Sequence, residues 1–114
     1  MTDDLLDAME REIERLRRRH AVLLRELPQS REMEARWVLE TQCLHWFVVF
    51  DQEVLEPDID VEITAEVLVV RARPISDAEV MLLGLLPVPS DFAIEDPMIE
   101  CGEGSLDIRI RRRP

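Results

Sequence analysis

The sequence of 114 residues contains no lysine, asparagine or tyrosine, and only three glycines. Without lysine, the chain cannot form Schiff bases through a side chain or use a lysine as a general base. Gly84, Gly102 and Gly104 are the only glycines, and they do not form a glycine-rich phosphate loop. The G-x-S-x-G and H-E-x-x-H signatures of hydrolases are missing as well. The sequence therefore predicts a protein that is not an enzyme and uses no cofactor.

Cysteines and long apolar runs are equally scarce. Two cysteines, Cys43 and Cys101, are too few for a disulfide framework. No apolar run reaches the roughly 18 residues that span a bilayer. The chain begins with Asp3 and Asp4, where a secretory signal would carry positive charge. We therefore expect a cytoplasmic protein with reduced thiols and no membrane partner.

Positive charge is outnumbered: 25 acidic residues face 14 basic ones, all arginine, and the net charge is −11. Nucleic-acid binding needs a basic surface that displaces counterions, so no nucleic-acid partner is expected. The basic residues cluster once, at the C-terminus, and we expect them to form a solvated tail. This tail contains Arg109, Arg111, Arg112 and Arg113.

The first 27 residues are patterned as one amphipathic helix, ended by Pro28. Acidic residues fall near its start and arginines near its end, as the helix dipole favours. Apolar residues recur at steps of three and four, which is the spacing of a coiled-coil seam. The seam comprises Leu6, Met9, Ile13, Leu16, His20, Leu23 and Leu27. This stripe predicts self-association into a homodimer or small homo-oligomer; the alternative is a helix packed on its own domain.

His20 lies within the seam. A polar residue there can set the register or weaken association below about pH 6.5, where imidazole becomes charged. The alternative is a partly exposed histidine near the helix end. Residues 29–36 form a connector, and Ser30 is placed to cap a short second helix.

From Trp37 onward, short runs rich in β-branched residues alternate with turn signals. Strands are expected at 44–50, 59–64, 67–72, 80–86, 98–101 and 105–110. Many short strands without a crossover helix predict an antiparallel sandwich over residues 37–114. The fold class is therefore mainly β, with an N-terminal helix at 1–28.

The order of these strands resembles the α-crystallin domain of small heat-shock proteins. WFVVFD at 46–51 and EPDIDV at 56–61 look like the strand, acidic turn and strand that open that domain. EVLVVRA at 66–72 looks like its next strand. LP at 86–87 and GSLDIRI at 104–110 look like its closing signature. The chain is also similar to compact CS-type co-chaperone domains, since the segment at 74–79 is too short for the strand that bacterial members exchange.

The resemblance implies a groove between two edge strands that accepts apolar peptide segments. By the resemblance, its residues are Val61, Ile63, Ile99 and Cys101. The alternative is that these four are ordinary core residues, because alternation gives every strand one buried face.

A zinc site is the remaining chemical possibility. Cys43 and His45 share one face of a strand, and Cys101 and His20 could complete a set. Structural zinc sites show paired close spacings, and this chain has only one such pair. We therefore expect no metal, with a buried cysteine and a hydrogen-bonded histidine instead.

Two functions remain. The resemblance implies an ATP-independent holdase that binds partly unfolded or apolar protein segments. The alternative is a non-enzymatic adaptor that uses the same fold and a dimerising helix to bind one specific protein partner. A redox sensor built on the two cysteines is a third, weaker hypothesis.

Overall fold

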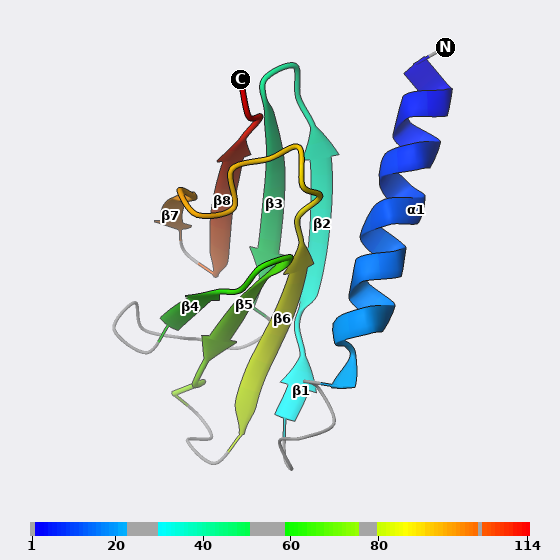
Figure 1. Ribbon diagram of the computed structural model, residues 1–114. Coiled ribbons are helices and arrows are strands. Elements are labelled where there is room, and N and C mark those ends of the chain that lie inside the picture. The colour runs from blue at the N-terminus through cyan, green and yellow to red at the C-terminus, as the bar shows by residue number, and fades with distance from the viewer. Residues whose placement is uncertain (1, 23–29, 51–58, 76–79, 103) are drawn as a thin grey trace.

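The computed structural model describes residues 2–22, 30–50, 59–75, 80–102 and 104–114. In these residues one helix precedes two stacked four-stranded sheets (Figure 1). The elements are α1 (Thr2–His20), β1 (Ser30–Glu32), β2 (Glu34–Leu39), β3 (Cys43–Val49), β4 (Ile59–Ile63), β5 (Val67–Ala72), β6 (Met81–Pro87), β7 (Met98–Gly102) and β8 (Ser105–Arg111).

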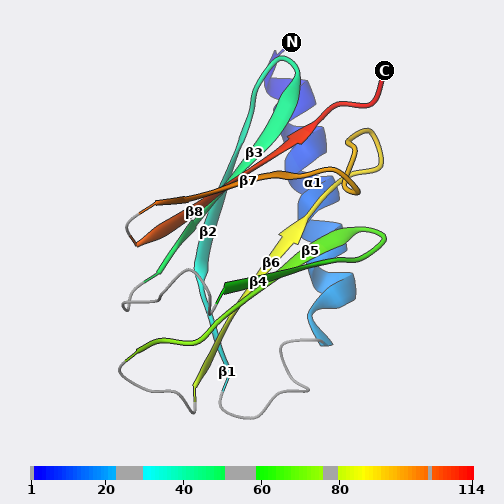
Figure 2. The same ribbon diagram turned by 90° about the vertical axis from the view of Figure 1, so that its left-hand side faces the viewer.

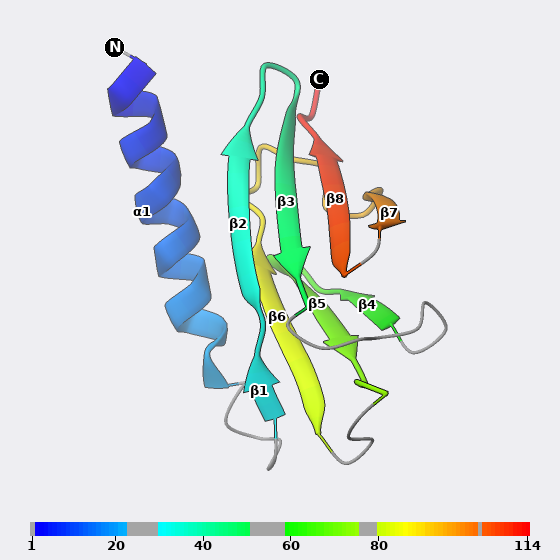
Figure 3. The same cartoon turned by 180° about the vertical axis from the view of Figure 1, so that it is seen from behind.

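The strand order is β1-β6-β5-β4 in one sheet and β2-β3-β8-β7 in the other. Every pair is antiparallel except β1 with β6. The predicted fold class, an antiparallel sandwich preceded by a helix, is confirmed. β4 and β7 are the end strands on one side of the sandwich, and α1 lies along the other side (Figures 1 and 3).

The core lies between the sheets because alternate residues of each strand point inward. Leu44, Trp46 and Val48 of β3 are buried there against Ile108 of β8 and the facing sheet. The indole Nε1 of Trp46 donates a hydrogen bond of 3.1 Å to the carbonyl of Pro87, so its polar atom is satisfied inside the core.

Sheet structure begins earlier than Trp37. The short helix expected after Ser30 is wrong, because Ser30–Glu32 is the strand β1, which pairs in parallel with β6. Met33 is buried in the core, and its amide donates to the carbonyl of Leu83. Ser30 followed by charged residues resembles the start of a helix in sequence. In the structure these charged residues lie on two strands and face outward.

The predicted N-terminal helix is confirmed from Thr2 to His20. The rest of its predicted length, at 23–27, lies outside the described residues. Met9, Ile13 and Leu16 are 8%, 5% and 2% exposed, and α1 contacts β6 and β5. The helix therefore packs on its own domain, which was the alternative to a coiled-coil seam.

Three side-chain contacts hold the last turns of α1 to the sandwich. Arg17 pairs with Glu32 of β1. Arg19 and His20 both reach Glu66, just before β5, at 3.2 and 2.9 Å. Because the hydrogen bond from His20 and the charge of Arg19 favour the carboxylate, the pKa of Glu66 is lowered.

The four arginines of the basic tail are exposed to solvent, as expected, but the tail is attached to the domain. Arg113 forms two hydrogen bonds to Glu95, at 2.7 and 2.9 Å, and its amide donates to the carbonyl of Asp91. Arg112 lies over the ring of Phe92, with its guanidinium carbon 5.1 Å from the ring centroid. Aromatic and acidic partners at 91–96, brought near by the fold, anchor the tail.

Candidate functional site

The candidate site is the open edge of the sandwich between β4 and β7, which faces the viewer in Figure 2. The strand register gives the direction of its side chains. Ile63 is opposite Leu68, and Ile99 is opposite Ile108, and both partners are fully buried between the sheets. Directly opposed residues share one face of a sheet, so Ile63 and Ile99 also point into the space between the sheets.

Ile63 and Ile99 are more exposed than inward-facing side chains of a sandwich usually are. Ile63 is 47% exposed and Ile99 is 45% exposed, although both face the interior. Cys101, opposite the buried Leu106, is exposed as well. Inward-facing side chains stay exposed only where no further element covers them, so this edge is an apolar opening rather than finished core.

Val61 is placed differently from the other three predicted groove residues. It is opposite Val70, is partly buried and packs against the main core. The core alternative therefore describes Val61 best, while Ile63, Ile99 and Cys101 form the open part of the edge.

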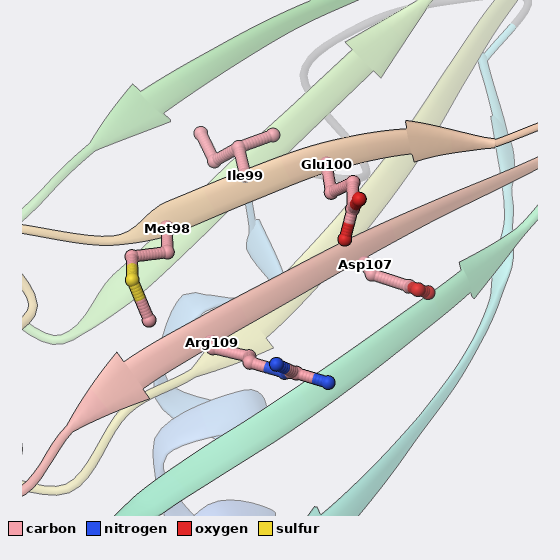
Figure 4. A pocket seen from close by; sticks show the side chains of 5 residues that line it. All are labelled: Met98, Ile99, Glu100, Asp107 and Arg109. Carbon is pink, nitrogen blue, oxygen red and sulfur yellow. The ribbon is translucent and has the colours of Figure 1, made fainter.

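β7 itself presents two faces. All five of its residues are exposed. In Figure 4, Ile99 points to the side of the facing sheet, whereas Met98 and Glu100 point to the opposite side. A shallow depression of about 320 Å³ at this strand is lined by Met98, Ile99 and Glu100 of β7 and by Asp107 and Arg109 of β8 (Figure 4).

The opposite side of the sandwich is not open. There Met9 and Ile13 of α1 belong to the same apolar cluster as the core residues between the sheets. The chain thus covers one side with its own helix and leaves the β4–β7 edge exposed.

Of the predicted self-association residues, Met9, Ile13 and Leu16 are buried against the sandwich. His20 is partly buried and bonded to Glu66, and Leu6 stays 42% exposed. Leu23 and Leu27 lie outside the described residues.

The four residues considered for zinc are not brought together. His20 belongs to the α1 contact with Glu66, and Cys101 lies on β7. Within the described ranges, no group of three histidine, cysteine or acidic residues is arranged to hold a metal ion.

Cys43 and His45 share Glu40 as a partner. The Cys43 thiol donates to one carboxylate oxygen at 3.4 Å, and His45 Nδ1 lies 3.3 Å from the other. The pKa of Cys43 is raised, mainly by burial and then by its bond to Glu40, which disfavours the thiolate form. The pKa of Glu40 is lowered by these same two partners.

Sequence reasoning missed two features of this region. Glu66 carries no pattern that marks it as the anchor of α1, because its partners are about 46 positions away. The opposition of Glu100 to Asp107 depends on the β7–β8 register, which alternation alone does not fix.

Solved structures show the same fold. Heat shock protein 16.0 from Schizosaccharomyces pombe aligns with a TM-score of 0.67 at 9% identity, over 77% of this chain and 71% of that one. HspA from Xanthomonas axonopodis aligns at 0.63 and 14% identity, over 74% and 96%. A small heat-shock protein from Xylella fastidiosa aligns at 0.62 and 13%, over 72% and 86%. The chain therefore has the α-crystallin-type fold of small heat-shock proteins.

No protein-family model matches the sequence, and no curated protein matches it. The solved structures confirm, at the level of the fold, the resemblance predicted from sequence motifs. Separately, no helix in the described part of the chain is long and apolar enough to cross a membrane.

Proposed function

We propose that this protein is an ATP-independent holdase that binds partly unfolded or apolar protein segments at the β4–β7 edge. The observation that carries the proposal is the exposure of Ile63 and Ile99, which face the interior and yet remain nearly half accessible. The likeness to small heat-shock proteins supports it. The net charge of −11 would keep complexes with apolar clients in solution.

The chemistry of binding would be hydrophobic and reversible. Full burial of an isoleucine side chain contributes roughly 1.5–3 kcal/mol, so covering the exposed half of one contributes roughly 1 kcal/mol. Two such side chains and a few backbone hydrogen bonds must still offset the entropy lost on association. Single segments should therefore bind weakly and leave easily, as a holdase requires, and no nucleotide or cofactor takes part.

The test is suppression of client aggregation, measured by light scattering with two unrelated, thermally unfolding client proteins. The double variant Ile63→Ser, Ile99→Ser should lose most of the protection. The matched control is Val38→Ser, Val49→Ser, because these valines are 48% and 46% exposed but lie on β2 and β3, away from the edge. The control should protect as the wild type does. Equal loss in both variants would show that the β4–β7 edge is not the binding site.

The adaptor alternative gives a different outcome in the same assay. An adaptor for one specific partner should protect neither client at any ratio of protein to client. The specific partner of an adaptor would be a protein that binds the wild type and the control variant but does not bind the edge variant. As partners we propose proteins only, and as location the cytoplasm, where two cysteines remain reduced.

We propose that self-association through α1 requires the helix to leave the sandwich. Met9, Ile13 and Leu16 cannot line a seam between two chains while they are buried on the sandwich, so the docked and the paired helix exclude each other. Leu6 separates the two states, because it belongs to the seam but is 42% exposed when α1 is docked. If the chain pairs through α1, Leu6→Asp should convert a dimer to a monomer in multi-angle light scattering. An unchanged mass would place the interface elsewhere.

A further inference from the structure

The outer face of the sheet β2-β3-β8-β7 is uncovered in this chain. Figure 3 looks onto this sheet, and no described helix or strand lies in front of it. Apolar side chains are nonetheless grouped on this face: Val38 of β2, Val49 of β3 and Met98 of β7 are each about half exposed. Apolar side chains grouped on an accessible face are typical of a surface that binds another protein.

His45 lies in the middle of this face and carries a nitrogen without a partner. Its Nδ1 is 3.3 Å from Glu40, whose pKa is lowered, so the carboxylate accepts and Nδ1 carries the proton. Nε2 is then a bare acceptor, and it is buried with no hydrogen bond to it from any described residue. Buried polar atoms without a partner are rare in folded proteins. The middle of the face therefore lacks a donor that the chain itself does not supply.

The strand register arranges the outer side chains in rows that cross all four strands, from β2 through β3 and β8 to β7. One row is Val38, His45, Arg109 and Met98. The next row is Arg36, Phe47, Asp107 and Glu100. The first row thus has an apolar residue at each end, and the second has a cation at one end and an anion at the other. Three strand spacings, or about 14 Å, separate the two ends.

A second copy of the chain can stack on this face about a two-fold axis that runs parallel to the strands, between β3 and β8. Such an axis keeps each row in register but exchanges its ends, so β2 of one copy lies over β7 of the other. Arg36 then meets Glu100 of the second copy, and Val38 meets its Met98, each twice by symmetry. An axis across the strands along the Arg36 row would instead stack like charges on one another. Charge complementarity therefore selects the first arrangement.

The shape of the face and its unpaired nitrogen agree with this arrangement. The shallow depression described above lies at β7 and β8, whereas Arg36 and Val38 are exposed on β2. Stacking brings β2 of the second copy to the depression. It also places Arg109, a hydrogen-bond donor, over His45 of the second copy.

We propose that this face is the interface of a homodimer in which the sheets β2-β3-β8-β7 of two copies stack face to face. The two Arg36–Glu100 pairs set the register, and the apolar side chains beside them become covered. A face about 15 Å wide is small for a specific interface, so the dimer should dissociate on dilution. Ile63 and Ile99 are not on this face, so the β4–β7 edge stays open in both copies.

The test is sedimentation velocity of the full chain between about 5 µM and about 500 µM, where a weak dimer of this size should form progressively. Arg36→Glu and Glu100→Arg should each raise the Kd of dimerisation about fivefold to thirtyfold, because each turns two exposed attractive pairs into repulsive ones. The double variant with both changes restores the two pairs with exchanged signs. Its Kd should return to that of the wild type.

The charge exchange separates this contact from other effects. Arg36→Glu makes the net charge more negative and Glu100→Arg makes it less negative, so a general charge effect cannot weaken the dimer in both. The two residues lie at opposite ends of a row, so the recovery cannot come from a contact within one chain. Arg11→Glu, at an exposed position of α1, is the matched surface control and should leave the Kd unchanged.

Three results would overturn the proposal. The wild type could stay monomeric at the highest concentration, or the double variant could dimerise as weakly as the single variants. A dimer that is lost in Leu6→Asp would place the interface on α1 instead. Recovery in the double variant, together with an unchanged dimer in Leu6→Asp, supports the stacked sheets.

Discussion

Replacing Leu16 by alanine tests whether α1 is an integral part of the folded domain. Leu16 is 2% exposed, and α1 contacts both β5 and β6. Truncating a buried leucine to alanine removes its transfer free energy and leaves a cavity, which together cost about 2–5 kcal/mol. We expect the free energy of unfolding to fall by about 2–3 kcal/mol, because a helix on the surface can partly close the gap.

The measurement is urea unfolding followed by circular dichroism, at about 1 µM and about 100 µM protein. Leu5→Ala is the control on the same helix, since Leu5 is 54% exposed, and it should change stability by less than about 0.5 kcal/mol. Docking within one chain makes both results independent of concentration. If the stripe instead paired two chains, a hundredfold dilution would cost about 2.7 kcal/mol. The docked helix would be refuted by equal effects of the two variants, or by a loss in Leu16→Ala that grows on dilution.

Three further predictions follow from single contacts. Trp46→Phe should lower the free energy of unfolding by about 1–3 kcal/mol in denaturant titrations, since it leaves the buried carbonyl of Pro87 without a donor. The lowered pKa of Glu66 stabilises the fold above its ordinary value of 4.5, and this contribution is lost as the pH falls below that value. Hydrogen-exchange protection of α1 should therefore drop in this range in the wild type, and a Glu66→Gln variant should be less protected at pH 7 with a smaller drop. The raised pKa of Cys43 should make its alkylation by iodoacetamide at pH 7.5 slower in the native protein than in urea, as mass spectrometry of its peptide would report; equal rates would contradict the burial of this thiol.

Alternation and turn residues were sufficient to predict most of the sandwich. The strand predicted at 67–72 coincides with β5, and that at 98–101 differs from β7 by one residue. The first is a run rich in valine that ends shortly before Pro74, and the second is a short segment that ends at Gly102. Gly104 illustrates the turn chemistry, because its φ of 73° between β7 and β8 is a conformation that glycine adopts without strain.

The remaining elements depended on contacts distant in sequence. β1 is a strand because its neighbour β6 is about 50 positions later and offers a parallel edge. Its own residues, Ser30 to Glu32, are polar and have no strand preference. The partner of the α1 stripe was undecided for the same reason, since a helix with Met9, Ile13 and Leu16 on one face packs equally well on a sheet or on another helix.

The candidate site was predictable only in part. The residues facing the edge follow from alternation, but their exposure depends on which strands end each sheet, and sheet order is not a local property. Val61 shows the limit of the pattern: it has the same alternation as Ile63, yet it is partly buried against the core while Ile63 is 47% exposed.

An open apolar edge is a hazard as well as a binding site, because two copies can pair along unprotected strands. Charged residues on an edge strand are one defence against such pairing, and β7 carries Glu100 beside Asp107. Two β7 strands brought edge to edge would place these carboxylates near one another, and their repulsion would disfavour pairing between copies.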